Sequence, residues 1–188
     1  MTLPLTRKEI SLLAHSPLFQ GVEEEILLHL AELEGASLVR FDAGVVYSPR
    51  HFRRSLGVVL SGQLQVTKGS LAVSTLEAGD LFGAAALYSD EPEFASTITA
   101  KGPSRCLMLE QALVDRLLAE QGRIRENYLC YLTGRIRFLS GRLQALAQPG
   151  VEGKLARYLM AGGGSSCPAT ELCQRLGVSR ASLYRAFS

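Results

Sequence analysis

Residues 168–187 have the sequence PATELCQRLGVSRASLYRAF, which predicts two short helices joined by a tight turn. Leu172 and Leu176 lie on one face of the first helix. Gly177 follows at once and tolerates the left-handed backbone of a sharp turn. Ser179 can then cap the second helix, because its hydroxyl accepts from a backbone N–H one turn further on. The stretch therefore predicts a helix-turn-helix.

The second helix of this stretch offers polar side chains to solvent. Leu183 and Phe187 are expected to pack inward, which leaves the other positions near its amino-terminal end facing outward. The candidate DNA-contacting residues are Ser179, Arg180, Ala181, Ser182, Tyr184 and Arg185. Arginine suits guanine edges and phosphates, and serine hydroxyls suit phosphates or bases. The alternative is a small helical hairpin with an arginine-bearing solvent face.

The charge of the chain is unevenly distributed. Residues 1–110 hold 9 Lys and Arg against 13 Asp and Glu, a net charge of −4, whereas residues 111–188 hold 11 against 5, a net charge of +6. A basic carboxyl-terminal part favours a polyanion as partner, because phosphate neutralisation supplies most non-specific affinity for nucleic acid. A merely solvated basic surface would give the same counts.

The composition indicates a folded protein with a sizeable core, since 47% of the residues are apolar. No stretch approaches the roughly eighteen consecutive apolar residues of a membrane span, and residues 1–10 lack a signal-peptide pattern. We therefore expect a cytoplasmic protein without a membrane partner. Four scattered cysteines without C-x-x-C spacing predict reduced thiols, and neither a metal site nor a bound cofactor.

The amino-terminal part changes its hydrophobic period near Ser37. Residues from about 7 to 34 show helical spacing of apolar side chains. Short alternating segments follow, such as 63–67 and 71–76, with glycines marking the turns between them. A short strand at 106–109 then precedes another helix. This pattern predicts a small antiparallel barrel or jelly roll.

The longest regular pattern is an apolar seam in the carboxyl-terminal half. Its residues are spaced 3, 4, 3, 4 and 3 apart: Leu129, Leu132, Ile136, Leu139, Leu143 and Leu146. This a/d spacing predicts a helix over about 123–147 that pairs with a second helix as in a coiled coil. The seam covers about two and a half heptads, so an ordinary helix packed on its own domain is the alternative. A further helix is expected at 151–160.

The order of these parts resembles the Crp/Fnr family of bacterial transcription regulators. Four stretches carry the resemblance, and they occur in the family's order: LFQGV at 18–22, VLSGQLQV at 59–66, GDLFGAAAL at 79–87 and LGVSR at 176–180. Four such stretches in this order are hard to obtain by chance. The resemblance covers nearly the whole chain.

The resemblance implies an α+β fold in three parts. Residues 1–110 would form a cyclic-nucleotide-binding-like β-barrel or jelly-roll sensor domain with amino-terminal helices. Residues 111–148 would form the dimerisation helix, and residues 149–188 an all-α, winged-helix-type helix-turn-helix domain. The family's recognition helix and β wing continue beyond the point corresponding to Ser188, so the last domain is expected to be cut short.

The resemblance also implies a ligand pocket. In the family's cyclic-nucleotide binders, the segment like 79–87 cradles the cyclic phosphate with backbone N–H groups. A Glu after its second glycine holds the ribose, and an Arg about ten residues on pairs with the phosphate. Here these positions are Ala84 and Phe94. Without the arginine, its charge-assisted bonds to phosphate are lost.

The expected pocket is therefore degenerate. It comprises Gly79, Phe82, Gly83, Ala84, Ala85, Phe94, Ala95 and Ser96. Glu91 and Glu93 nearby would repel an anion further. We expect an unknown small-molecule effector other than a cyclic nucleotide, or none. A regulator that responds to cyclic AMP despite the altered pocket is the alternative.

Other chemistries of such barrels fit the sequence less well. The family's iron–sulfur branch uses an amino-terminal cysteine cluster, whereas the first cysteine here is Cys106. A haem ligand would have to come from His15, His29 or His51. A thiol switch would use Cys106 or Cys130. A cupin-like metal enzyme needs three or more converging ligands, but the barrel region has one histidine, so we predict no enzyme.

Together these features predict a homodimeric, sequence-specific DNA-binding transcription regulator. A two-fold dimer implies a palindromic operator in double-stranded DNA, with recognition helices roughly 34 Å apart. An activator would also contact RNA polymerase. Ala181 stands where the family's best-known members carry Glu, so the target sequence is expected to differ, with a thymine-methyl contact there. A further alternative to a DNA-binding regulator is a dimeric barrel module that does not bind DNA.

Overall fold

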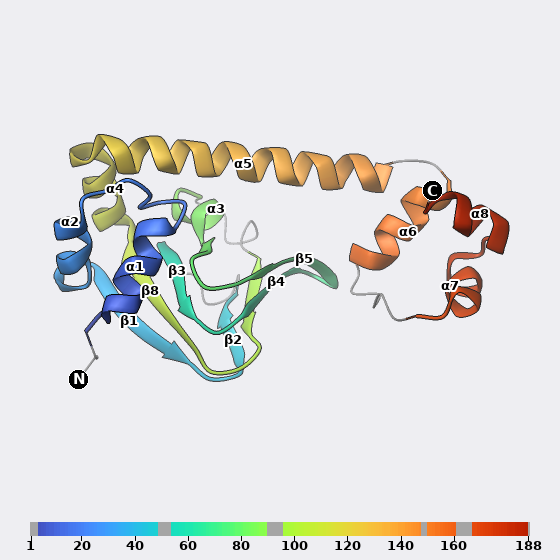
Figure 1. The fold of residues 1–188 in the computed structure, drawn as a ribbon, viewed down its shortest axis with the longest axis horizontal. Helices are drawn as coiled ribbons and strands as arrows, with labels where there is room; N and C mark the ends of the chain where they lie inside the picture. The colour runs from blue at the N-terminus through green and yellow to red at the C-terminus, as the bar shows by residue number, and fades with distance from the viewer. Residues whose placement is uncertain (1–3, 49–53, 90–95, 148–149, 161–166, 188) are drawn as a thin grey trace. The chain divides into compact units, whose positions relative to one another are not determined.

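The computed structural model describes residues 4–48, 54–89, 96–147, 150–160 and 167–187 (Figure 1). The helices are α1 (Arg7–His15), α2 (Glu24–His29), the 3-10 helix η1 (Leu30–Glu32), α3 (Ala84–Leu87), α4 (Gln111–Glu120), α5 (Gly122–Ala147), α6 (Val151–Met160), α7 (Ala169–Leu176) and α8 (Arg180–Arg185). The strands are β1 (Ala36–Phe41), β2 (Gly44–Tyr47), β3 (Ser55–Ser61), β4 (Leu64–Lys68), β5 (Leu71–Leu76), β6 (Leu81–Phe82), β7 (Thr97–Ala100) and β8 (Ser104–Glu110).

The chain divides into two compact units. The first unit consists of Met1–Gly69 and Ser74–Thr133, and the second of Ser70–Val73 and Gly134–Ser188. Within the described parts of both units, no helix is long and apolar enough to cross a membrane.

Two four-stranded antiparallel sheets form the β structure. One has the order β1-β8-β3-β6 and the other the order β2-β7-β4-β5. The expected barrel or jelly roll is therefore a β sandwich preceded and followed by helices. The predicted strand at 71–76 is β5 with the same bounds, and the predicted strands at 63–67 and 106–109 are β4 and the middle of β8.

The central strand β3 is buried on both faces. Leu56, Val58 and Leu60 pack into a cluster with apolar residues of α1, α2 and α4. Val59 points the other way and packs between the sheets with Leu64 and other residues of β2, β4 and β7. A strand alternates its side chains between two faces, so burial on both sides explains why residues 56–60, LGVVL, carry no polar side chain between Ser55 and Ser61.

An aromatic ring packs directly against a glycine inside the sandwich. Gly57 of β3 pairs with Phe82 of β6. A Cβ atom at position 57 would lie 2.1 Å from the Phe82 ring. The ring therefore occupies the volume that a side chain at position 57 would need, and Phe82 is itself buried.

The start of α5 is anchored on the first unit. Ile124 and Tyr128 are buried there, with exposed fractions of 1% and 4%. Asn127 lies between them and donates from Nδ2 to the carbonyls of Leu18, at 3.0 Å, and Gln20, at 2.8 Å. The long helix predicted at 123–147 is confirmed, and its first three turns pack on the first unit.

The helices of the second unit enclose a small core of their own. Leu155 of α6, Leu172 and Cys173 of α7, and Leu183 of α8 are its buried residues. Gly177 ends α7 in the left-handed conformation, with φ of 61° and ψ of 46°, as the tight turn requires. The predicted helices at 151–160 and on both sides of the turn are confirmed.

The prediction that Phe187 packs inward is wrong. Helix α8 ends at Arg185, so position 187 no longer follows the helical spacing that would place it beneath Leu183. The Phe187 side chain is 63% exposed, whereas Leu183 is 1% exposed.

The same substitution is expected to have opposite effects at two glycines. Gly83 has φ of +85°, and a Cβ atom there would lie 2.3 Å from the carbonyl oxygen of Ser55, so Gly83→Ala lowers the free energy of unfolding by about 2–4 kcal/mol. Gly141 lies within α5 with nothing within 4 Å of its Cβ position, so Gly141→Ala raises that energy by about 0.5–1 kcal/mol. Thermal unfolding followed by circular dichroism measures both changes, and equal shifts of one sign would contradict the prediction.

Candidate functional site

The candidate nucleic-acid interface is the outer face of α8. Ser179 caps this helix, because its Oγ accepts from the backbone N–H of Ser182 at 3.1 Å. Leu183 fixes the inner face in the core of the second unit. The structure places Arg180, Ala181, Tyr184 and Arg185 on exposed positions, and Ser182 is partly buried. The six predicted residues thus lie together at and after the start of one helix.

The two arginines of this face have different surroundings. The Arg180 guanidinium donates to Thr170 Oγ1, which joins the start of α8 to the start of α7. Arg185 donates from Nε to the carbonyl of Ala181, 3.4 Å away on its own helix. Both side chains remain exposed, so their charges face solvent together with the Tyr184 ring.

The hydrogen bonds of Ser179 limit what this residue can offer to DNA. Besides accepting from Ser182 N–H, Ser179 Oγ donates to the Ser182 hydroxyl at 2.9 Å. Its single proton is therefore used inside the motif, and one lone pair is already occupied. Ser179 shapes the helix start, while the Ser182 hydroxyl keeps a proton to donate outward.

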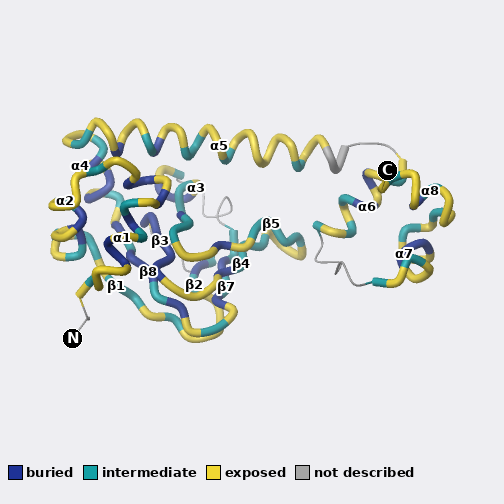
Figure 2. The backbone as a smooth tube through the Cα atoms, in the orientation of Figure 1, coloured by how far each residue is buried: buried dark blue, intermediate teal, exposed yellow. Residues whose placement is uncertain are grey.

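The apolar seam lies along α5 and is largely exposed in the single chain. Leu129, Ile136, Leu139 and Leu143 have exposed fractions between 49% and 68%. Figure 2 shows most of this helix as exposed beyond its first turns. Leu132 is partly buried against the core of the first unit, and the side chain of Leu146 lies outside the described residues. Four exposed large apolar side chains along one helix exceed the scattered exposure usual for a monomer surface.

A stacked arginine pair flanks this seam. The guanidinium groups of Arg135 and Arg142 lie 4.8 Å and 5.4 Å from the ring centroid of Phe138. Cation–π contacts of this kind hold long side chains along the helix surface.

The turn from β6 to α3 joins a two-residue strand to a four-residue helix. Gly83 is left-handed, and its carbonyl accepts from the N–H groups of Ala86 and Leu87 at 2.9 Å and 3.0 Å. Ala84 and Ala85, however, present only methyl groups at the start of α3. Gly79 is partly buried in the turn before β6, where its N–H donates to the Val59 carbonyl.

Only part of the predicted pocket is described. Phe82 is buried between the sheets, and Ser96 is partly buried just before β7. Phe94 and Ala95 lie outside the described residues. The predicted pocket residues of the β6–α3 turn thus lie together. The predicted role of Phe94 and Ala95 in a pocket stays a prediction.

Two hydrogen bonds join this turn to the surrounding helices. The Tyr88 hydroxyl, after α3, donates to Asp115 Oδ1 of α4 at 2.7 Å. Burial, and then this bond, raise the pKa of Tyr88 above its ordinary value. The Tyr131 hydroxyl of α5 donates to the Leu81 carbonyl of β6 at 3.1 Å. Both contacts link residues far apart in sequence, and no motif or spacing marks them.

The other candidate chemistries are constrained by burial. Cys106 is fully buried, and burial raises the pKa of its thiol to about 12, so the reactive thiolate is disfavoured. Cys130 is exposed. His15 and His29 lie on the surface, 2.7 Å from the Ser11 carbonyl and 3.1 Å from the Glu32 carboxylate, and His51 lies outside the described residues. The described residues contain no group of three potential metal ligands.

Comparison with known proteins agrees with this architecture. Residues 41–121 match the family model of the cyclic nucleotide-binding domain. No curated protein matches the sequence. The family model covers β2 to α4, with the end of β1. It therefore includes the β6–α3 turn but neither α5 nor the helix-turn-helix.

Solved structures resemble the chain at low sequence identity. The catabolite activator protein of Thermus thermophilus is 24% identical, with a TM-score of 0.61 over 92% of this chain and 85% of that chain. The sensor domain of the transcriptional regulator DNR from Pseudomonas aeruginosa is 19% identical, with a TM-score of 0.56 over 76% of this chain and 99% of that one. Cyclic-AMP-bound PfPKA-R (141–441) is 19% identical, with a TM-score of 0.59 over 70% of this chain, which spans only 45% of that chain.

The comparisons therefore define the class of fold. It is α+β: a β sandwich like that of cyclic nucleotide-binding domains, followed by helices as in the catabolite activator protein. Domains of this kind occur in transcription regulators and in a protein bound to cyclic AMP.

Proposed function

We propose that the chain is a homodimeric, sequence-specific DNA-binding transcription regulator of the Crp/Fnr type. The observation that carries the proposal is α8, a helix capped by Ser179 whose inner face is fixed by Leu183 and whose outer face carries Arg180, Tyr184 and Arg185. A helix presented in this way can enter the major groove with its amino-terminal residues toward the bases. The net charge of +6 over residues 111–188 supports binding to phosphates.

The seam of α5 supports a two-fold dimer. Its exposed leucine and isoleucine side chains would be buried against the same face of a second copy, as knobs in a coiled coil. A two-fold axis along this helix implies a palindromic operator, with half-sites roughly 34 Å apart. No catalysis is assigned to the chain, and an activator of this kind would also contact RNA polymerase.

Regulation would act through a shift in population between two helix pairings. An effector held by the β sandwich would change the packing at Tyr131 and Leu81, where α5 meets β6. A different pairing of the seams would then move the two helix-turn-helix motifs between separated and DNA-competent spacings.

The altered β6–α3 turn argues against a cyclic nucleotide as effector. Ala84 has no carboxylate for a ribose hydroxyl, and Phe94 has no guanidinium for a phosphate. The second candidate function is a regulator that responds to cyclic AMP, which the match of residues 41–121 to the cyclic nucleotide-binding domain favours.

The DNA-binding face is tested by removing both arginines of α8. Arg180→Ala/Arg185→Ala is expected to weaken binding at least about tenfold to a duplex enriched by the wild-type chain from a random library, because base and phosphate contacts are lost. Fluorescence anisotropy at fixed salt measures the affinity. The matched control, Arg7→Ala/Arg40→Ala, removes the same charge from exposed positions of the first unit and is expected to bind within about twofold of wild type. Equal loss in both variants, or no enriched duplex at all, would contradict the proposal.

The dimer is tested by placing a charge in the seam. Ile136→Glu is expected to turn a sedimenting dimer into a monomer, because a carboxylate at this a position would be desolvated in the paired helices. Gln144→Glu adds the same side chain at an exposed position beside the seam and is expected to leave the dimer intact. Analytical ultracentrifugation distinguishes the two states. A monomeric wild-type chain, or a dimeric Ile136→Glu variant, would overturn the seam as the interface.

Cyclic AMP at millimolar concentration is expected to leave the melting temperature of the wild-type chain unchanged. A ligand that binds only the folded chain stabilises it in proportion to the logarithm of its concentration over Kd, so tight binding would be visible. Thermal-shift measurement with cyclic AMP and cyclic GMP checks this. A stabilisation of several degrees by either would favour the second candidate function.

A further inference from the structure

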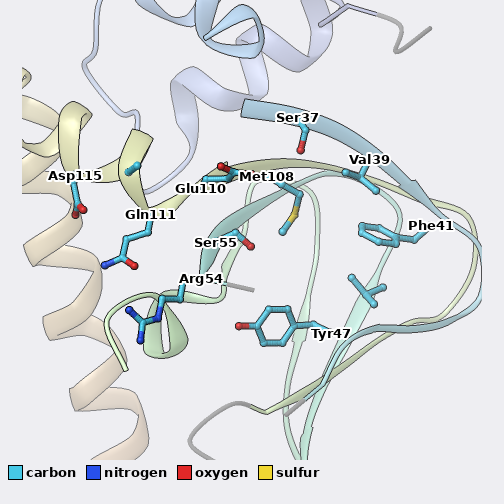
Figure 3. Close-up of a pocket in the computed structure, with 12 residues that line it drawn as sticks. Ser37, Val39, Phe41, Tyr47, Arg54, Ser55, Met108, Glu110, Gln111 and Asp115 are labelled. Carbon is cyan, nitrogen blue, oxygen red and sulfur yellow. The ribbon is translucent and has the colours of Figure 1, made fainter. Parts of the chain in front are cut away.

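A cavity of the first unit lies at the β1 and β8 side of the sandwich. Its volume is about 880 Å³, within the range of small-molecule sites. Figure 3 shows the side chains of Val39, Phe41, Tyr47 and Met108 facing it from β1, β2 and β8. None of residues 79–87 lines it. The cavity is therefore separate from the turn to which the sequence assigned the ligand.

A buried hydroxyl faces this cavity without a hydrogen-bond partner. Ser55, the first residue of β3, is 5% exposed, and its Oγ has no partner among the described residues. Figure 3 shows its side chain directed into the space between Met108 and Tyr47. Buried hydroxyl groups in folded proteins are nearly always paired, so an orphan one beside an open volume indicates a missing partner. The volume is far larger than a single bridging water needs.

The charged groups near the cavity do not favour an ionic ligand. Glu110 and Asp115 carry negative charge at the end of β8 and on α4, and Asp115 already accepts from Tyr88. Arg54 has an interaction partner of its own. Burial raises the pKa of Tyr47 to about 12, because desolvation at this position disfavours the ionised phenolate.

We propose that this cavity binds an uncharged, mainly apolar organic molecule that carries one hydrogen-bonding group for Ser55 Oγ. The apolar body lies among Val39, Phe41, Val46 and Met108, and its hydroxyl, amine or carbonyl pairs with the serine. The site belongs to the first unit alone, so it stands whether or not the chain binds DNA.

Ser55 connects the cavity with the β6–α3 turn. The carbonyl of Ser55 lies against Gly83, where an added Cβ would be only 2.3 Å away. The backbone of one residue therefore touches the turn while its side chain faces the ligand. The Ser55 backbone thus links the cavity to the β6–α3 turn.

The experiment uses N-phenyl-1-naphthylamine, an uncharged aromatic probe whose fluorescence rises in apolar surroundings and whose N–H can donate to a hydroxyl. The full chain is expected to bind one probe molecule saturably. Val46→Trp fills the cavity and is expected to weaken binding at least about tenfold. The matched control is Val45→Trp, because Val45 is the neighbouring residue of β2 and is 65% exposed; its affinity is expected to stay within about twofold of wild type.

A second variant distinguishes loss of the site from misfolding of the Val46→Trp chain. Ser55→Ala removes the orphan hydroxyl, so it is expected to raise the melting temperature of the free chain by roughly 2–4 °C while weakening probe binding about three- to tenfold. A purely structural role for Ser55 would lower stability instead. Absence of saturable binding by the wild type, or equal probe affinity in folded wild-type, Val46→Trp and Ser55→Ala chains, would overturn the proposal.

Discussion

Burial of β3 on both of its faces is the constraint on which the first unit depends. Leu56, Val58 and Leu60 hold the helices to the sandwich, and Val59 holds the two sheets together. Each apolar cluster is thus built on the same six residues of backbone. A polar residue in place of Val58 or Val59 would remove an apolar contact from one cluster and bury a polar group without a partner.

The long helix α5 serves two environments along its length. Ile124, Asn127 and Tyr128 fasten its start to the first unit, by burial and by the two hydrogen bonds of the asparagine. Beyond Thr133, the described large apolar side chains of the helix, Ile136, Phe138, Leu139 and Leu143, are exposed. The alternative of an ordinary helix packed on its own domain therefore describes its beginning, whereas the later part of the seam lacks a partner within the described chain.

The parts of the fold that depend on local spacing could be predicted from the sequence. The helix over 123–147, the turn at Gly177 and the cap at Ser179 each follow from residues within one or two helical turns. Phe187 was misplaced because the periodic pattern does not reveal that α8 ends at Arg185. The bond from Tyr88 to Asp115 and the cavity around Ser55 depend on strand order, which brings together residues far apart in the chain, and no spacing in the sequence encodes it.

The pair formed by Gly57 and Phe82 has an evolutionary consequence. Because the ring fills the volume of a missing side chain, neither position can change alone without either a clash or a void. A homologue with alanine or valine at position 57 must carry a smaller residue at position 82, and the two changes must have arisen together or through a destabilised intermediate. Covariation of these two positions among related chains would thus show that a change in side-chain volume at one position was compensated at the other.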